Sequence, residues 1–153
     1  KSAVLEATAD EALIQAARHS LRDDELVVVM AKAQPDRFGG GQSLRLTVVQ
    51  LWDLPSARCR FGKFLRVQVN GRMPDLPRLF KDFAPMREET EHGQLEHGLP
   101  VRLRLERSGE QLSARAELAL GEKARFYPSD AALASWMAQA DQGQAQIVYE
   151  QGA

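Results

Sequence analysis

The sequence is poor in cysteine and has no long hydrophobic run, and both features restrict what the protein can be. Cys59 is its single cysteine, which excludes an internal disulfide and any zinc site that needs several cysteines. A membrane-spanning helix requires about 20 consecutive apolar residues, and no stretch approaches that length. The N-terminus lacks the basic and then apolar pattern of a secretion signal. We therefore expect no membrane association and a reducing compartment, the cytoplasm.

The chain also lacks an excess of charge of either sign. Its 20 Lys and Arg and its 21 Asp and Glu give a formal net charge of -1. No global field therefore attracts it to nucleic acid or to anionic lipid, and any contact with DNA must come from a local basic patch. With 153 residues, of which 44% are hydrophobic, the sequence has the size and composition of one medium or two small globular domains.

The first residues predict a strand followed by a helix. Ser2–Leu5 is short and apolar enough for a strand. Thr8 stands three residues before Glu11, the spacing of a capping box, and apolar residues then recur at helical period as far as Leu21. The chain begins with Lys1 rather than Met and enters a strand at once, so we expect it to be a segment of a longer protein.

A hairpin is predicted next. Leu26–Ala31 is a continuous apolar run rich in Val, which predicts a strand covered on both faces. Leu44, Leu46 and Val48 alternate with polar residues, the pattern of a half-buried strand. The glycine-rich segment 35–41 between them permits a turn, so the two strands should pair.

The middle of the sequence predicts a connector, a strand, a helix and a loop. After a connector over Pro55–Lys63, the alternating segment Phe64–Val69 predicts a strand. Leu76–Phe83 has apolar residues at i, i+3, i+4 and i+7, which predicts an amphipathic helix that Pro85 ends. The polar and acidic segment Met86–Gly98 is expected to be a loop.

The last third predicts a second hairpin, a helix and a final strand. Val101–Leu105 and Leu112–Ala116 alternate on either side of a turn at Ser108-Gly109. In the corner Pro128-Ser129-Asp130, either Ser129 or Asp130 is suited to cap a helix, and Ile147–Tyr149 predicts the last strand. The apolar stripe of that helix comprises Leu133, Trp136, Met137 and Ala140.

Several of these segments resemble the C-terminal region of the alpha subunit of bacterial DNA polymerase III. The most specific are the Phe38-Gly39-Gly40 turn and the Pro128-Ser129-Asp130 corner. The resemblance covers nearly all of the chain, in Ala3-Val4-Leu5, the helix to His19, Leu26–Val29, Arg37–Gly40 and Arg125–Leu133.

The resemblance implies an α+β protein in two parts. A strand, a connecting helix and a glycine-turned hairpin are similar to strands three to five of an OB-fold, so residues 1–60 would form an incomplete OB-fold-like barrel without its first two strands. Residues 61–153 would form a small mixed α/β domain, which in this family docks the tau subunit of the clamp loader. The family's polymerase active site and its sliding-clamp contact lie upstream of this segment.

The function implied by the resemblance is therefore non-catalytic. The segment would couple the polymerase to tau in the replisome during DNA replication, and the parent protein would be a DNA-directed DNA polymerase, a nucleotidyltransferase. No cofactor is expected in the segment itself. The alternative is a single-stranded DNA-binding OB module, because the family's OB-fold is associated with single-stranded template.

A candidate DNA-binding site lies in the first half. The basic face would consist of Lys32, Arg37, Arg45, Arg58 and Arg60. Phe38 in the turn, or Trp52, would stack on a base, a contact typically worth about 1–3 kcal/mol. Ordinary surface charge is the competing interpretation, since strand ends and loops are basic for many reasons.

Candidate partner-binding residues lie in the second half. Arg102 and Arg104 alternate outward in their predicted strand and would line a polar interface rim. Trp136 and Tyr149 are candidate anchors, because aromatic residues dominate interface hot spots. The place of Trp136 on a helical stripe equally predicts a core residue.

No metal site or catalytic residue is predicted. His92 and His97 lie among glutamates, but His-x-x-x-Glu-His is one residue longer than the inverted zincin motif, and Gly93 and Gly98 argue against the shared helical face that zinc binding needs. Cys59 has basic neighbours but no His nearby in the sequence to act as a base, so an incidental thiol is expected.

The missing barrel strands have one further consequence. A first strand without its barrel neighbours would expose unpaired backbone groups. Such edges pair readily with another chain, so we expect either a homodimer through this edge or a loosely ordered N-terminal part.

Overall fold

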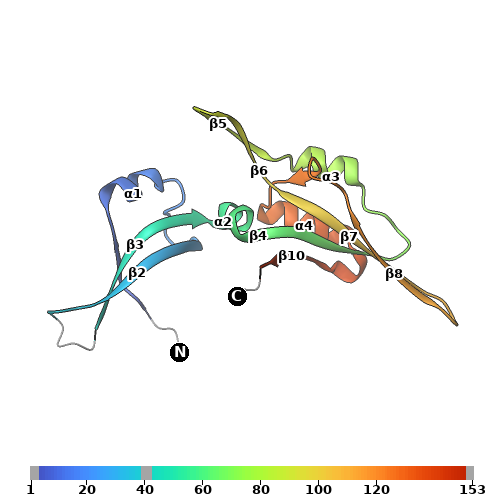
Figure 1. Cartoon of the computed structure of the whole chain (residues 1–153), viewed down its shortest axis with the longest axis horizontal. Helices are drawn as coiled ribbons and strands as arrows, with labels where there is room; N and C mark the ends of the chain where they lie inside the picture. Colours follow the sequence, from blue (N-terminus) through green and yellow to red (C-terminus); the bar gives the residue numbers. More distant parts are fainter. Residues whose placement is uncertain (1–3, 39–42, 151–153) are drawn as a thin grey trace. The chain divides into compact units, whose positions relative to one another are not determined.

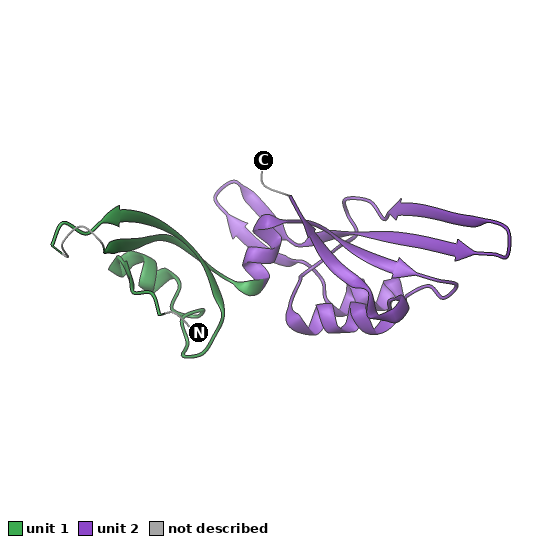
Figure 2. Cartoon of the chain, turned by 90° about the horizontal axis from the view of Figure 1, so that it is seen from below, with its two compact units in different colours: residues 1–54 green, residues 55–153 purple. Residues whose placement is uncertain are grey.

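The chain forms two compact units. The computed structural model describes residues 4–38 and 43–150, and the contacts divide the chain into unit 1, residues 1–54, and unit 2, residues 55–153 (Figure 2). Both units combine helices with strands, so the protein is of the α+β class. None of the described helices has the length and apolar character that crossing a bilayer requires.

The described residues of unit 1 form a three-stranded sheet and one short helix (Figure 1). β1 (Ala7–Ala9) lies parallel to β3 (Leu44–Asp53), and β2 (Val27–Pro35) pairs antiparallel with the other side of β3. The helix α1 (Glu11–Ala16) lies between β1 and β2 in the sequence. The predicted pairing of these two strands is thus confirmed, while residues 39–42 of the predicted glycine-rich turn lie outside the described part of the chain.

The first strand lies later than expected. Residues 4–6 have no regular structure, residues 1–3 lie outside the described part of the chain, and the strand occupies Ala7–Ala9 instead. Its position is set by pairing with Leu46–Val48 of β3, a long-range contact that the apolar pattern of Ser2–Leu5 does not contain.

The cap of α1 also differs from the prediction. The carboxylate of Asp10 accepts the backbone N–H of Leu13 at 2.7 Å, so Asp10 is the N-cap. Thr8 belongs to β1, and its hydroxyl donates to the carbonyl of Leu46 at 3.3 Å. A residue held in the sheet is not available to cap the helix.

Among its described residues, unit 1 has no fully buried side chain. The prediction that Leu26–Ala31 is covered on both faces is therefore wrong, and Leu26 is 76% exposed. β2 is an edge strand in a sheet of three, and α1, the helix described in unit 1, has only six residues. An apolar run is buried only where other elements are present to cover it.

Unit 2 contains the larger, five-stranded sheet. Its strands are β4 (Gly62–Val69), β7 (Leu99–Ser108), β8 (Ser113–Ala119), β9 (Arg125–Phe126) and β10 (Ala145–Tyr149). The order is β10-β4-β7-β8, with β9 paired to the start of β7. β4 and β7 are parallel, and the other pairs are antiparallel.

The core of unit 2 lies between one face of this sheet and two helices, α3 (Leu76–Asp82) and α4 (Asp130–Gln139) (Figure 1). Trp136 of α4 is 0% exposed, and its ring centroid lies 5.5 Å from that of Phe80 and 5.6 Å from that of Phe126. Alternate residues of the strands complete this core: Leu65, Val67, Val69, Val101 and Leu103. The alternation predicted for both strands is confirmed.

Met137 does not belong to this core. It is half-exposed, because it follows Trp136 directly and therefore points about 100° away around the helix. The predicted stripe was correct for Trp136, which is in the core, and for Leu133 and Ala140, which pack against it, but wrong for Met137. Ala132, which is also buried, was not part of the predicted stripe.

The corner before α4 is fixed by two sets of hydrogen bonds. The hydroxyl of Ser129 accepts the N–H of Ala132 at 3.1 Å, so Ser129 is the N-cap. The guanidinium of Arg58 donates to the carbonyl of Pro128 at 3.0 Å and to the carboxylate of Asp130 at 2.6 Å. Arg58 comes from α2 (Leu54–Phe61), so this arginine ties two distant segments of unit 2 together.

Two segments expected to be irregular have regular structure. Pro55–Lys63 is not a loose connector, since α2 runs directly into β4. Met86–Gly98 is not a loop but a hairpin of β5 (Met86–Thr90) and β6 (Gly93–His97), with Arg87 bonded across it to Glu96 at 3.1 Å. The hairpin is exposed on both faces, so it has no apolar alternation that marks it as strands.

Substitutions of Trp136 test the described core. We expect Trp136→Ala to lower the free energy of unfolding by about 3–5 kcal/mol, because it leaves a large cavity. Trp136→Phe should cost much less, since it keeps an aromatic ring and removes an indole N–H that is buried with no hydrogen-bond partner in the described structure. Urea unfolding followed by circular dichroism measures both, and equal losses would contradict this account.

Candidate functional site

Part of the predicted DNA-binding surface lies at the end of the β2–β3 hairpin in unit 1. Arg37, Phe38 and Arg45 line one hollow of about 420 Å³. Gln34, which also lines it, lies directly opposite Arg45 in the sheet register. Lys32 is two residues from Gln34 on the same strand and therefore shares its face. The structure thus brings these four residues to one end of one hairpin, whereas Arg58 and Arg60 of the predicted basic face lie in α2, in unit 2.

Asp36 shapes this hairpin end. Its carboxylate accepts the backbone N–H of Phe38 at 3.1 Å, and its own N–H donates to the carbonyl of Ser43 at 2.9 Å. Phe38 is 99% exposed, so its ring is open to contact by a ligand. Lys32 and the two arginines carry three positive charges at this end of the hairpin, and Asp36 carries one negative charge, so the local charge is positive.

The second candidate surface is the sheet face of unit 2 that the helices do not cover. Because side chains alternate along a strand, burial of Leu65 and Val67 directs Arg66 to this other face. The parallel register places Arg66 directly opposite Arg102, with Arg104 two residues further along β7. We call this surface the arginine face; it consists of Phe64, Arg66, Gln68, Arg102, Arg104, Glu106, Arg115 and Glu117.

Glu117 and Phe64 hold two of these arginines in place. The carboxylate of Glu117 lies 3.7 Å from Nε of Arg66 and 3.4 Å from Nη1 of Arg102. The guanidinium carbon of Arg102 lies 4.0 Å from the centre of the Phe64 ring, and that of Arg66 lies 5.3 Å from it. The ring is therefore covered by cations and is stabilised by them.

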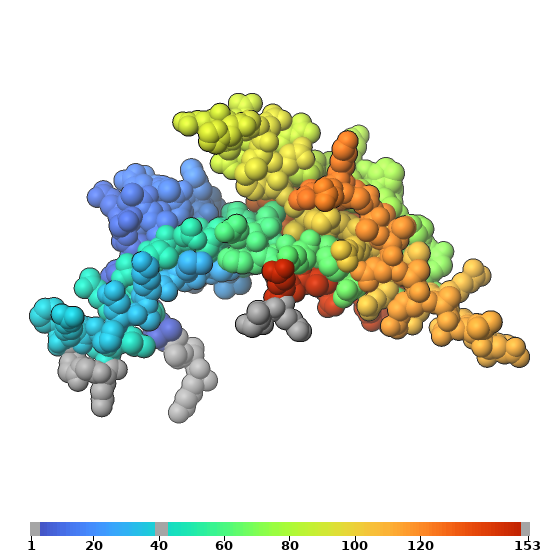
Figure 3. All heavy atoms as spheres, viewed as in Figure 1, coloured from blue at the N-terminus to red at the C-terminus, as the bar shows by residue number. Residues whose placement is uncertain are grey.

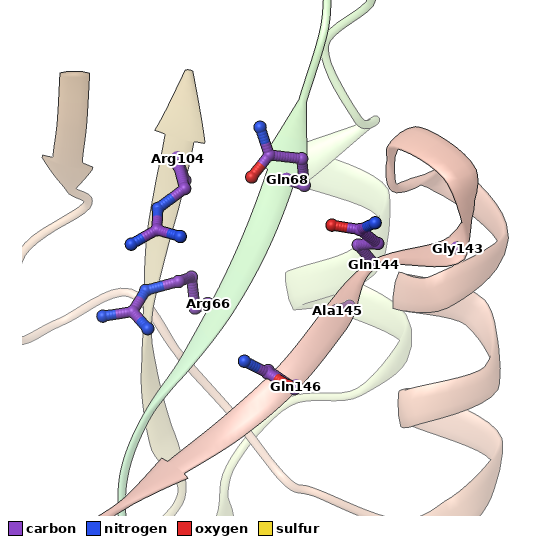
Figure 4. Close-up of a pocket in the computed structure, with 7 residues that line it drawn as sticks. All are labelled: Arg66, Gln68, Arg104, Gly143, Gln144, Ala145 and Gln146. Atoms are coloured by element: carbon purple, nitrogen blue, oxygen red, sulfur yellow. The ribbon is translucent and has the colours of Figure 1, made fainter. Parts of the chain in front are cut away.

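Arg104 is placed differently. Its guanidinium group has no hydrogen bond or ion pair within the part of the chain that the structure describes. Together with Arg66 it borders a hollow of about 240 Å³, closed on the other side by Gln144 and Gln146 near the start of β10 (Figure 4). Guanidinium and amide N–H groups that line one hollow suit the oxygen atoms of a carboxylate or a phosphate.

The four predicted partner-binding residues are not brought together. Arg102 and Arg104 lie on the arginine face. Trp136 is wholly buried on the opposite side of the sheet, so its interpretation as a partner anchor does not agree with the structure. Tyr149 is half-exposed at the end of β10, an edge strand, where it lies opposite Gly62.

The sequence interpretation missed Phe64 and Arg66. A signal for both was present, because the alternation of the predicted strand Phe64–Val69 places them outward whenever Leu65 and Val67 are inward. Their position beside Arg102 depends on the parallel pairing of β4 with β7, which no local pattern encodes.

One of the two histidines among the glutamates forms a contact within its own hairpin. Nε2 of His97 lies 2.7 Å from a carboxylate oxygen of Glu88 across the β5–β6 hairpin. Among the residues that the structure describes, no group of three or more His, Cys, Asp or Glu side chains is placed to hold a metal ion.

Comparison with known proteins adds no further assignment. No family model, no curated protein and no solved structure matches this chain.

A double-mutant cycle tests the stacking of Arg102 on Phe64. Phe64→Leu and Arg102→Met together should destabilise unit 2 less than the sum of the single changes, by about 0.5–1 kcal/mol, because each single change already removes the cation–π contact. The control cycle pairs Phe64→Leu with Arg115→Met, since Arg115 bonds to Glu106 instead. Coupling of equal size in both cycles, measured by urea unfolding, would contradict the assignment.

Proposed function

We propose that this chain is a non-catalytic part of the alpha subunit of a bacterial DNA polymerase III and that it couples the polymerase to the tau subunit of the clamp loader. We infer the family from the sequence resemblance, and we infer the partner-binding function from the arginine face. In this proposal the sheet face of unit 2 that carries Arg102 and Arg104 meets tau.

The topology of unit 1 supports this parentage. Its order is β1-β3-β2, with β1 parallel to β3 and the helix between β1 and β2. An OB barrel has the same arrangement in its third, fifth and fourth strands, with a helix after the third. Unit 1 would then be the later part of such a barrel, which accounts for apolar side chains such as Leu26 and Leu44 that are exposed in unit 1.

The chemistry of the arginine face supports a protein partner. Arginine is enriched at protein interfaces, where its planar guanidinium group binds carboxylates through two hydrogen bonds. Arg104 offers such a group without an ion pair among the described residues, beside a hollow lined by further N–H donors. Acidic side chains of tau would satisfy these donors.

Charge reversal on this face should abolish the coupling. We expect Arg102→Glu with Arg104→Glu to weaken binding of purified tau at least about 100-fold, because repulsion replaces attraction at the centre of the interface. Arg107→Glu is the matched control, since Arg107 lies on the same strand with its side chain on the opposite face. Isothermal titration measures all three proteins, and failure of the unaltered chain to bind tau would refute the proposal.

The hairpin end of unit 1 favours a second candidate function, binding of single-stranded DNA. A ring that is 99% exposed beside Arg37 and Arg45 combines base stacking with phosphate contact. In this function the hairpin binds template strand without reading its sequence.

Two substitutions separate the contributions of charge and stacking. Arg45→Glu should weaken oligonucleotide binding and reduce the slope of log K against log salt by about 0.7, the value for one lost phosphate contact to a single strand. Phe38→Ala should weaken binding about 5- to 150-fold with little change of slope, because stacking is not electrostatic. Arg18→Glu, an exposed charge reversal outside the hairpin, is the control. Affinity too low to measure at low salt would exclude this function.

A further inference from the structure

Strand β8 is an unpaired edge of the sheet in unit 2. It stands last in the strand order, and all of its residues are exposed. The far part of the β7–β8 hairpin projects beyond the helices, at the lower right of Figures 1 and 3. An exposed strand edge offers a row of backbone donors and acceptors to another strand.

The hydrogen bonds at the two ends of β8 fix which backbone groups face outward. The N–H of Gly109 donates to the carbonyl of Leu112, and the N–H of Leu120 donates to the carbonyl of Val101. Bonded and non-bonded pairs alternate along an antiparallel ladder, so the even-numbered residues of β8 bond to β7. The residues whose N–H and C=O groups point away from β7 are Ser113, Arg115, Glu117 and Ala119.

We propose that a second copy of this chain pairs antiparallel with β8 about a two-fold axis at Ala116. In this register Arg115 of each copy lies opposite Glu117 of the other, and Ser113 lies opposite Ala119. These are the residues with outward backbone groups, so the register forms about eight backbone hydrogen bonds. The two sheets join into one continuous sheet. This inference does not depend on the proposed role in replication.

The charges on β8 are self-complementary only in this register. A shift that centres the axis on Arg115 places two arginines opposite each other, and a shift to Glu117 places two glutamates opposite each other. Like charges directly opposite on neighbouring strands are destabilising. With the axis at Ala116, both cross-copy pairs are of opposite charge, which selects one register and favours a second copy over an unrelated partner.

The neighbouring strands extend this complementarity. Within one copy, Arg104 lies opposite Glu117 and Glu106 lies opposite Arg115. The proposed pairing therefore continues an alternating row across the interface, from Arg104 to Glu117, then to Arg115 and Glu106 of the second copy. The net charge brought together is zero, so association does not build up charge of one sign.

The other face of β8 permits the close approach. Ala116 would lie opposite Ala116, and Ala114 opposite Leu118, which is half-exposed in the single chain. Alanine side chains leave room for two strands at normal spacing, and Leu118 would lose part of its exposed apolar surface. Next to this row lies a hollow of about 470 Å³ bordered by Met73, Leu105, Ala114 and Ala116.

Charge-reversal variants, measured one at a time and as a mixture, test the proposed register between the two β8 strands. We expect the unaltered chain to dimerise with a Kd of about 10–100 µM, measured by sedimentation equilibrium. Arg115→Glu alone and Glu117→Lys alone should each be monomeric, because each puts two like-charged pairs into its own dimer. An equimolar mixture of the two variants should dimerise, because every cross-copy pair in the mixed dimer is then of opposite charge.

Engineered cysteines supply a second test that does not alter the charges. In a Cys59→Ser background, Ala116→Cys should form a disulfide-linked dimer under mild oxidation, because a directly opposed non-bonded pair has a Cα separation of about 4.5 Å, within disulfide range. Ala114→Cys is the matched control on the same face. Its counterpart in the second copy would lie roughly 13 Å away along the strand, so it should remain unlinked.

The proposal is overturned if the unaltered chain sediments as a monomer at about 0.5 mM, since that excludes the affinity expected here. It is also overturned if Ala114→Cys cross-links as readily as Ala116→Cys, or if a dimer forms that neither charge variant weakens. Binding of tau by a chain that remains monomeric would overturn this inference alone and leave the proposed function standing.

Discussion

Burial of one face of the large sheet beneath Trp136 is the constraint on which the rest of unit 2 depends. Leu65 and Val67 are fully buried there, and a strand that buries its odd-numbered residues must present its even-numbered ones on the other side. Arg66 therefore reaches the uncovered face because its two neighbours belong to the core. The position of the arginine face therefore depends on the core. A one-residue shift of β4 would bury the guanidinium group of Arg66 and expose Leu65 and Val67.

Unit 1 lacks such a constraint. Its described side chains include none that is fully buried, so its strands are held mainly by their ladders and by partial burial at positions such as Val27 and Val28. Small sheets with little apolar burial are marginal on their own. The same lack of cover that weakens unit 1 leaves Phe38 open at the end of its hairpin.

Sequence patterns predicted most directly the elements whose side chains are sorted by burial, and they missed a hairpin in which no such sorting exists. The strand Phe64–Val69 and the helix from Leu76 were predicted because apolar residues report the core directly. The β5–β6 hairpin was missed because both its faces are exposed, so charged cross-strand pairs replace the apolar alternation. Of the arginine face, the outward direction of Arg102 and Arg104 could be predicted. The contact of Arg66 with Glu117 could not, since it joins residues that are 51 positions apart in the sequence.

At the β8 edge of the same sheet, charged side chains favour pairing with a second strand, although charges on an edge strand usually prevent such pairing. Natural edge strands often carry charged residues, because like charges repel when two edges meet. On β8 the two charges are of opposite sign and two residues apart, so an antiparallel copy meets attraction where a chain with one sign of charge would meet repulsion. The hollow beside Arg104 lies on the β4 and β10 side of the sheet, away from this edge. Pairing through β8 would therefore leave the donors of Arg104 accessible, and a dimer would present two such surfaces to acidic partners.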